Sequence, residues 1–285
     1  MRPPEHETLT LAGLSVQVAR WGCGEDGCPI LALHGFTGCG ADFMPLVSGL
    51  KRPVIAPDFI GHGGTDAPDD IEPYRMEAVV EQLEALVEEC LPDRFMLLGY
   101  SMGGRAALHL APRILDRLEA MVLVGTHPGI EDERWRGHRY TGDDELAARI
   151  LRRGMEWFQG YWASNPIIAT QDRIPEPARS AMIESRARNR PQGLAGSLRG
   201  MGLGVMTPTL DHLEALDVPT LLLVGAEDEK YAELAMTMAE ILPRAQVSRI
   251  PGAGHCAHLE RPSAAAQAIR WFLSSAARAV SPEPE

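Results

Sequence analysis

The stretch that most constrains this chain is GYSMG at residues 99–103, which matches the pattern Gly-x-Ser-x-Gly. An apolar run, FMLL, precedes it, and a helix-forming segment, RAALHL, follows it after Gly104. In such a strand–turn–helix setting the turn is so tight that the serine takes strained backbone angles, and the flanking glycines leave room for the chain. The Ser101 hydroxyl then stands at the amino end of a helix, where negative charge is favoured. The motif therefore predicts a reactive serine, which requires a base and an acid further along the chain.

Short apolar runs recur along the chain and alternate with segments whose apolar residues have helical spacing. The runs lie at residues 30–33, 53–57, 95–98, 120–125 and 219–225, and the clearest helical segment covers residues 72–91. Two segments of alternating polarity, at 8–11 and 14–19, precede them as the strands of a half-buried hairpin. Fully apolar strands that alternate with helices predict an α/β fold, with a mostly parallel sheet covered by helices on both faces.

The alternation breaks between residues 127 and 210, where we find only helix-like pieces rich in Arg, Met and Trp. The expected helices there cover residues 143–151, 155–162, 177–188 and 193–201. Strand and helix signals then resume as far as residue 277. We therefore predict one core made of residues 1–126 and 211–280, an inserted helical cap over 127–210, and a disordered tail over 281–285.

The composition limits the partners of the chain. Its 285 residues suffice for one large domain with an insertion, and the net charge of −12 argues against binding to nucleic acid or an anionic membrane. No apolar run has the length of a membrane span, and the N-terminus lacks the apolar core of a signal peptide. We expect a cytoplasmic protein, and the composition carries no information on its oligomeric state. An acidic protein can still hold a basic pocket for an anionic substrate.

The cysteines do not indicate a metal site or a disulfide framework. Their number is odd and their spacing matches no zinc pattern; they are Cys23, Cys28, Cys39, Cys90 and Cys256. We interpret all five as reduced thiols and expect neither a metal nor a cofactor. Cys256 lies beside a candidate functional histidine, but a small apolar filler is the better interpretation than a nucleophile.

A base and an acid for Ser101 follow two later strands. His255 lies in a Gly-rich loop directly after the last predicted strand, at residues 245–250, and its ring can reach over the sheet toward the serine. Asp228 follows the preceding strand, where it can orient the imidazole and stabilise its charged form. An aspartate after a strand is often only a helix cap. His258 therefore stays open as an alternative to His255, and Glu227 as an alternative to Asp228. The expected catalytic residues are Ser101, Asp228 and His255.

An oxyanion hole requires two backbone N–H groups that are fixed before the reaction. Met102, the residue after the serine, supplies one of them, and Phe36 in the loop HGFTG at residues 34–38 is our choice for the other. His34 in the same loop and His62 in a later turn are interpreted as structural.

These motifs together resemble the α/β-hydrolase superfamily over nearly the whole chain. A narrower set resembles the 2-succinyl-6-hydroxy-2,4-cyclohexadiene-1-carboxylate synthases of menaquinone biosynthesis. It consists of GYSMGGR at 99–105, HPG at 127–129, Arg136 and Arg139, RGMGLG at 199–204, and GAEDEK at 225–230. This resemblance includes the predicted cap, where α/β-hydrolases differ most from one another.

The resemblance implies a lyase that needs no cofactor. Its substrate is a cyclohexene with an enolpyruvyl ether, a succinyl chain and a ring carboxylate, and is therefore a tricarboxylate. Ser101, assisted by His255 and Asp228, would remove a proton next to the succinyl ketone, and elimination would then expel pyruvate.

The resemblance also implies a set of substrate-binding residues. By the family pattern these are Tyr100, Arg105, Arg139 and Trp162, to which we add Arg188. Arg136 precedes Arg139 by three residues, a spacing that can place both side chains on one helix face. Guanidinium groups suit the binding of carboxylates through two hydrogen bonds.

Two other functions are compatible with the same scaffold. One is a serine carboxylesterase or lactonase, in which Ser101 forms an acyl-enzyme. The other is a non-catalytic ligand-binding protein, which would tolerate loss of Ser101, Asp228 or His255. The three residues alone do not distinguish a lyase from an esterase.

Overall fold

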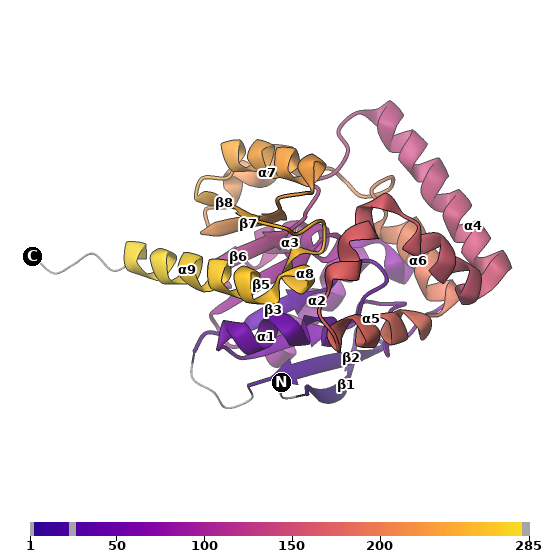
Figure 1. The fold of residues 1–285 in the computed structure, drawn as a ribbon, viewed down its shortest axis with the longest axis horizontal. Helices are drawn as coiled ribbons and strands as arrows, with labels where there is room; N and C mark the ends of the chain where they lie inside the picture. Colours follow the sequence, from indigo (N-terminus) through magenta and orange to yellow (C-terminus); the bar gives the residue numbers. More distant parts are fainter. Residues whose placement is uncertain (1–2, 23–26, 281–285) are drawn as a thin grey trace, which may run out of the picture.

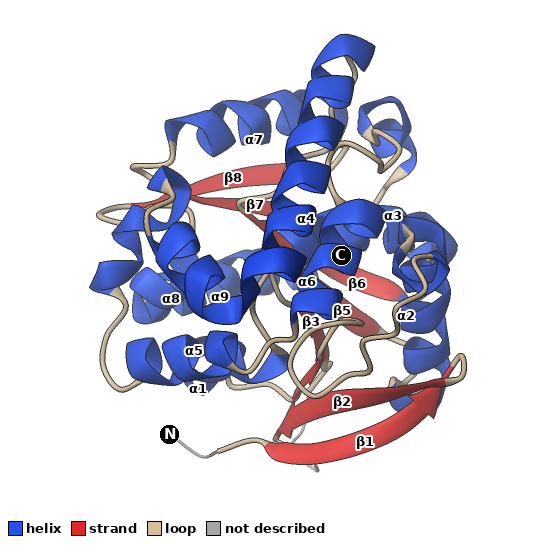
Figure 2. Ribbon diagram, turned by 90° about the vertical axis from the view of Figure 1, so that its right-hand side faces the viewer, coloured by secondary structure: helices blue, strands red, loops and turns tan. Residues whose placement is uncertain are grey.

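The structure, a computed structural model, describes residues 3–22 and 27–280. The tail predicted at 281–285 and Cys23 lie outside these residues. Eight strands form one sheet in the order β1-β2-β4-β3-β5-β6-β7-β8. They are β1 (Glu5–Leu11), β2 (Leu14–Trp21), β3 (Ile30–Leu33), β4 (Val54–Pro57), β5 (Phe95–Tyr100), β6 (Leu118–Val124), β7 (Thr220–Gly225) and β8 (Ala245–Ile250). Strands β1 and β2 run antiparallel to their neighbours, and all pairings from β4 to β8 are parallel (Figure 2).

Helices cover the sheet on both faces, as the apolar strands predicted. One face carries α2 (Met76–Cys90), α3 (Met102–Leu110) and α7 (Glu229–Ile241), and the other carries α1 (Met44–Leu50) and α9 (Pro262–Val280). Neighbouring strand residues divide between the two cores: Leu97 and Leu222 pack with the first set, whereas Leu98 and Leu221 pack with the second. This alternation follows from the period of two along a strand.

The connection between β6 and β7 is helical and lies beyond one edge of the layered core (Figure 1). It holds α4 (Glu133–Ala163), η5 (Pro166–Arg173), α5 (Ala178–Ala187) and α6 (Pro191–Met201). Helices α4 and α6 pack together around a small apolar cluster that includes Ile150, Phe158 and Leu194. The division into a core and a cap with the boundaries given above stays a prediction.

One helix of this connection differs from the sequence expectation. The two helices expected at 143–151 and 155–162 lie on either side of a break in α4 at Gly154, where φ is 75° and ψ is −177°, but the first of them begins already at Glu133. Its first turn is capped by the Asp132 side chain, which accepts a hydrogen bond from the Trp135 N–H at 2.8 Å. The early turns carry no apolar stripe, and Trp135 is 66% exposed, so periodicity did not reveal them.

Across residues 3–22 and 27–280, no helix combines the length and the apolar character that crossing a bilayer requires.

Candidate active site

Ser101 occupies the sharp turn between β5 and α3. Its backbone has φ 50° and ψ −106°, a strained conformation for a non-glycine residue, and its N–H donates to the Val124 carbonyl at 2.9 Å. The neighbouring glycines are required by space, because a Cβ at Gly99 would collide with the Gly103 carbonyl, and one at Gly103 with the Leu33 carbonyl. The turn thus presents the Ser101 side chain at the carboxyl edge of the sheet.

Two residues from later strand ends complete a hydrogen-bonded relay with this serine. His255 Nε2 lies 3.0 Å from Ser101 Oγ, and His255 Nδ1 lies 2.7 Å from Asp228 Oδ2. Because Nδ1 faces a carboxylate, it carries the proton, and Nε2 is left to accept one from the serine. The imidazole is only 5% exposed and packs against the rings of Tyr231 and Tyr100, with centroid distances of 4.3 and 5.4 Å.

The loop at residues 34–38 and the start of α3 lie beside the serine. Phe36 and Met102 both line the cavity described below, and among the described residues neither backbone N–H has a hydrogen-bond acceptor. The His34 ring braces this loop, since Nε2 accepts from the Phe59 N–H at 2.9 Å and Nδ1 donates to the Gly35 carbonyl at 2.8 Å. Both amide groups are therefore unused donors at the wall of the cavity, and their role as an oxyanion hole stays a prediction.

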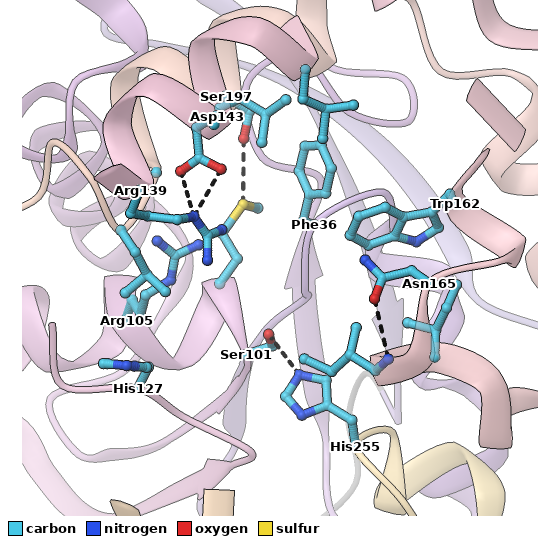
Figure 3. Close-up of a pocket in the computed structure, with 18 of the residues that line it drawn as sticks. Phe36, Ser101, Arg105, His127, Arg139, Asp143, Trp162, Asn165, Ser197 and His255 are labelled. Atoms are coloured by element: carbon cyan, nitrogen blue, oxygen red, sulfur yellow. Dashed lines mark hydrogen bonds and ion pairs between the residues drawn. The ribbon is translucent and has the colours of Figure 1, made fainter. Parts of the chain in front are cut away.

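A cavity of about 400 Å³ opens above Ser101 and His255 and is closed over by the helical connection. Figure 3 shows Arg105 and Arg139 on one side of Ser101, and Trp162 and Asn165 on the other. Four of the predicted substrate-binding residues line it, namely Tyr100, Arg105, Arg139 and Trp162. Arg186 from α5 lines it as well. The cavity thus joins a serine relay to three guanidinium groups.

The three arginines are held in different ways. Arg105 is buried and donates to the Met201 carbonyl at 2.6 Å; burial, followed by the nearby charge of Arg139, lowers its pKa to about 10. It is therefore still charged at neutral pH. Arg139 Nε donates to both oxygens of Asp143, and Arg186 donates to Gln171 Oε1 at 2.8 Å.

Comparison with known proteins identifies the family. The profile of the "alpha/beta hydrolase fold" family matches residues 29–262. The chain belongs to the α/β-hydrolase family. Within it, a 2-succinyl-6-hydroxy-2,4-cyclohexadiene-1-carboxylate synthase of Salmonella paratyphi C (strain RKS4594) is 31% identical over 88% of this chain and 96% of its own. A Bacillus subtilis (strain 168) protein, which bears the same name with a provisional qualifier, is 36% identical over 86% of this chain and 90% of its own.

Solved structures agree with this placement. MenH from S. aureus superposes on this α/β-hydrolase with a TM-score of 0.85 at 27% identity, over 91% of this chain and 98% of its own. A thermophilic esterase from Thermogutta terrifontis, bound to malate, superposes with a TM-score of 0.80 at 26% identity, over 95% of this chain and 99% of its own. The core fold and the helical connection are therefore shared by proteins of more than one activity.

The alternative histidine and acid lie elsewhere in this α/β-hydrolase. The His258 ring is buried between Tyr100 and Phe43, with centroid distances of 4.4 and 5.5 Å, and Glu227 pairs with Arg173 at 2.6 Å. The structure thus brings His255 and Asp228, and not these alternatives, to Ser101. Burial also raises the pKa of the Cys256 thiol to about 12, which leaves it protonated and weakly nucleophilic.

Two predicted substrate-binding arginines lie away from the cavity. Arg136 donates to the carbonyls of Ile130 and Glu131, at 2.8 and 3.1 Å. Arg188, which follows the last residue of α5, borders a separate hollow of about 160 Å³. Arg186 faces the active-site cavity instead, because residues two apart on a helix point in nearly opposite directions. One signal in the sequence could have indicated this: Arg186 follows the apolar Met182 by four residues, so both lie on the same face of the helix. In the structure Met182 is buried.

Sequence reasoning also missed polar residues of the cavity wall. His127 lines it, and its Nδ1 accepts from the Gly129 N–H at 3.1 Å, so its Nε2 carries the proton. Burial, followed by the charges of Lys230 and Arg105, lowers its pKa to about 4, which makes it a neutral donor at pH 7. The signal was the HPG motif at 127–129, which was used for the resemblance but given no role.

Proposed function

We propose that this α/β-hydrolase is a 2-succinyl-6-hydroxy-2,4-cyclohexadiene-1-carboxylate synthase, which eliminates pyruvate from the cyclohexene tricarboxylate described above. The observation that carries the proposal is the Ser101–His255–Asp228 relay opening into a cavity lined by three arginines. The names of the Salmonella and Bacillus relatives support the same substrate. A cytoplasmic site of action is part of this proposal.

The relay supplies a general base. His255 Nε2 accepts the Ser101 proton, and the serine oxygen takes the proton next to the succinyl ketone while Asp228 stabilises the imidazolium. The electron pair of the broken C–H bond becomes an enolate, whose oxygen accepts hydrogen bonds from the N–H groups of Phe36 and Met102. The enolate then collapses, a ring double bond forms, and the C–O bond to the enolpyruvyl group breaks. The departing group takes up a proton and leaves as pyruvate.

The cavity arginines bind the three carboxylates. Arg105, Arg139 and Arg186 approach the cavity from α3, α4 and α5. Arg105 and Arg139 lie together on one side of Ser101 (Figure 3), where they can bind neighbouring carboxylates, and Arg186 can contact a third. Tyr100 and Trp162 supply flat surfaces next to the ring. Because charged hydrogen bonds act strongly in a partly buried site, we attribute substrate orientation to this arginine set.

The charge of the chain is divided in a way that favours an anionic substrate. Residues 127–210 hold 12 arginines and 10 carboxylates, a net charge of +2, and the remainder holds 15 basic and 29 acidic residues, a net charge of −14. The positive charge is thus concentrated in the part that covers the cavity. Such a distribution raises the local concentration of an anion at the entrance.

An esterase is the second candidate. The 3.0 Å contact between Ser101 and His255 suits acylation as well as proton abstraction, and the Thermogutta esterase shares the fold. The test is to follow pyruvate release with lactate dehydrogenase while intact mass is recorded during turnover. The lyase proposal expects pyruvate without an acyl adduct on Ser101. An adduct that accumulates, with no pyruvate above the spontaneous rate, would replace it with the esterase.

A further inference from the structure

The loop that carries His255 is held by a carboxylate that the mechanism above does not use. Glu260 is 0% exposed and lies in the short helix α8 (Ala257–Glu260). Its Oε2 accepts from the Gly254 N–H at 2.7 Å, and its Oε1 accepts from the Cys256 N–H at 3.1 Å and from the Thr170 hydroxyl at 2.8 Å. All three donors point at one buried side chain.

The energetic cost of burying the Glu260 carboxylate must be offset by other interactions. An ionised carboxylate loses its hydration on burial, which costs several kcal/mol unless donors replace the water. Among the described residues Glu260 has no ion-pair partner, so its three hydrogen bonds carry the whole compensation. A well-packed apolar residue would avoid the cost altogether. The carboxylate therefore performs a task that a core residue could not.

The position of its donors indicates the task. Gly254 and Cys256 are the residues immediately before and after His255, so Glu260 fixes the backbone on both sides of the imidazole. The ring must lie within hydrogen-bond distance of Ser101 and Asp228 at once, which leaves little freedom to the loop. Displacements of about 1 Å at such a centre cost on the order of a hundredfold in rate.

The third donor comes from the other part of the chain. Thr170 belongs to η5, and a Cβ placed on Gly254 would collide with its side chain, so η5 packs directly on the His255 loop. The neighbouring Ile167, Ile168 and Gln171 of the same segment line the active-site cavity. Through Glu260, a segment that lines the cavity is thus hydrogen-bonded to the loop that carries the base.

We propose that Glu260 is a positioning residue that holds His255 against Ser101. Thr170, in the helical connection, assists it by donating a hydrogen bond to the Glu260 carboxylate. The proposal rests on the proposed function only in taking the serine relay as the reactive centre. The competing explanation is that Glu260 merely terminates α8 and stabilises the fold.

The test compares Glu260→Gln, Thr170→Val and Thr170→Ser with the wild-type protein. Glutamine keeps the shape but turns one acceptor into a donor, so one flanking N–H loses its partner. Valine keeps the shape of threonine and removes only the hydroxyl, whereas serine retains it and is the matched control. Three measurements apply: the rate at which a small organophosphonate modifies Ser101, the low-field proton resonance of the His255–Asp228 hydrogen bond, and kcat and KM for pyruvate release.

We expect Glu260→Gln to slow phosphonylation and kcat by about tenfold or more, to change KM by less than about threefold, and to shift or broaden the resonance. Thr170→Val should show a smaller loss of the same kind, and Thr170→Ser should match the wild type. A folded Glu260→Gln protein with a normal phosphonylation rate and an unchanged resonance would overturn the proposal. If Glu260→Gln does not fold, a Thr170→Val protein identical to Thr170→Ser in all measurements would overturn it.

Failure of the proposed function would look different. Absence of pyruvate release by the wild type would remove the synthase assignment, whereas phosphonylation and the proton resonance report on the relay without that substrate.

Discussion

Arg139 and Asp143 form an ion pair at the edge of the active-site cavity, with Arg139 Nε 2.8 and 2.9 Å from the two carboxylate oxygens. Both residues line the cavity, and the Asp143 side chain is only 9% exposed. The pair holds the guanidinium in place and partly offsets its charge. The guanidinium is thus oriented by a carboxylate that itself borders the cavity.

This pairing leads to the first prediction. Replacing Arg139 with Ala removes a charged hydrogen bond and also leaves a buried negative charge beside an anionic ligand. We expect KM for the tricarboxylate to rise by about 10- to 100-fold, with a much smaller effect on a neutral ester. Adding Asp143→Ala should recover part of the loss. Steady-state kinetics checks this, with Arg136→Ala as the control; equal effects of Arg139→Ala on both substrates would exclude a carboxylate clamp.

Two neighbouring arginines, Arg186 in α5 and Arg188 at its C-cap, give a second comparison. Arg186 faces the cavity and Arg188 does not, so Arg186→Ala should raise KM by about tenfold or more, whereas Arg188→Ala should stay within about twofold of the wild type. Isothermal titration with the product provides the same ranking without turnover. The opposite ranking would mean that α5 is rotated relative to the cavity.

Much of the fold followed from the sequence because its strands are fully apolar and end in turn residues. The predicted strand at 30–33 coincides with β3, and the one at 53–57 differs from β4 by a single residue. The relay could be predicted for a related reason, since Ser101, Asp228 and His255 each follow a strand that the sequence reveals.

Other features depend on geometry that a linear pattern does not contain. The choice between Arg186 and Arg188 depends on the rotational phase of a short helix. Glu260 was missed because its three donors come from residues 170, 254 and 256, and only the folded chain brings them together.

Buried histidines should make the fold sensitive to acid. Burial lowers the pKa of His34 to about 4 and those of His62 and His258 to about 3, against about 6.5 in the unfolded chain. Below pH 6.5 the unfolded chain therefore binds more protons, so their contribution to stability is complete above that pH and is lost as pH falls toward 3. Asp42, whose pKa burial raises to about 6, and Asp58, whose pKa burial also raises, act in the opposite direction but are outnumbered by the three histidines.

His258 offers a direct check of this effect. Its Nδ1 is buried without a partner among the described residues, and its ring packs against Tyr100 and Phe43, so Phe should fit. We expect His258→Phe to reduce the slope of unfolding free energy against pH, between pH 4 and 6, by up to about 1.4 kcal/mol per pH unit. Urea unfolding followed by circular dichroism measures it. An unchanged slope would show that His258 does not contribute.

The uneven charge distribution predicts a salt effect on substrate capture. kcat/KM for the tricarboxylate should fall by about tenfold or more as ionic strength rises from about 0.01 to 0.3 M, with little change for a neutral ester. Arg152→Glu, at an exposed position of α4, should lower kcat/KM at low salt and leave kcat unchanged. Arg244→Glu is the matched control. Arg244 is also exposed, but it precedes β8 and therefore lies at the amino ends of the parallel strands, whereas the cavity lies at their carboxyl ends. Equal effects of the two variants would contradict steering by the helical connection.

The most direct test of the central claim is pyruvate release from the cyclohexene tricarboxylate by the wild-type protein and by Ser101→Ala. The account expects release well above the spontaneous rate for the wild type, and a loss of at least about a thousandfold in kcat for the variant, with substrate binding retained. Release by the wild type no faster than the spontaneous reaction, or undiminished release by Ser101→Ala, would contradict it.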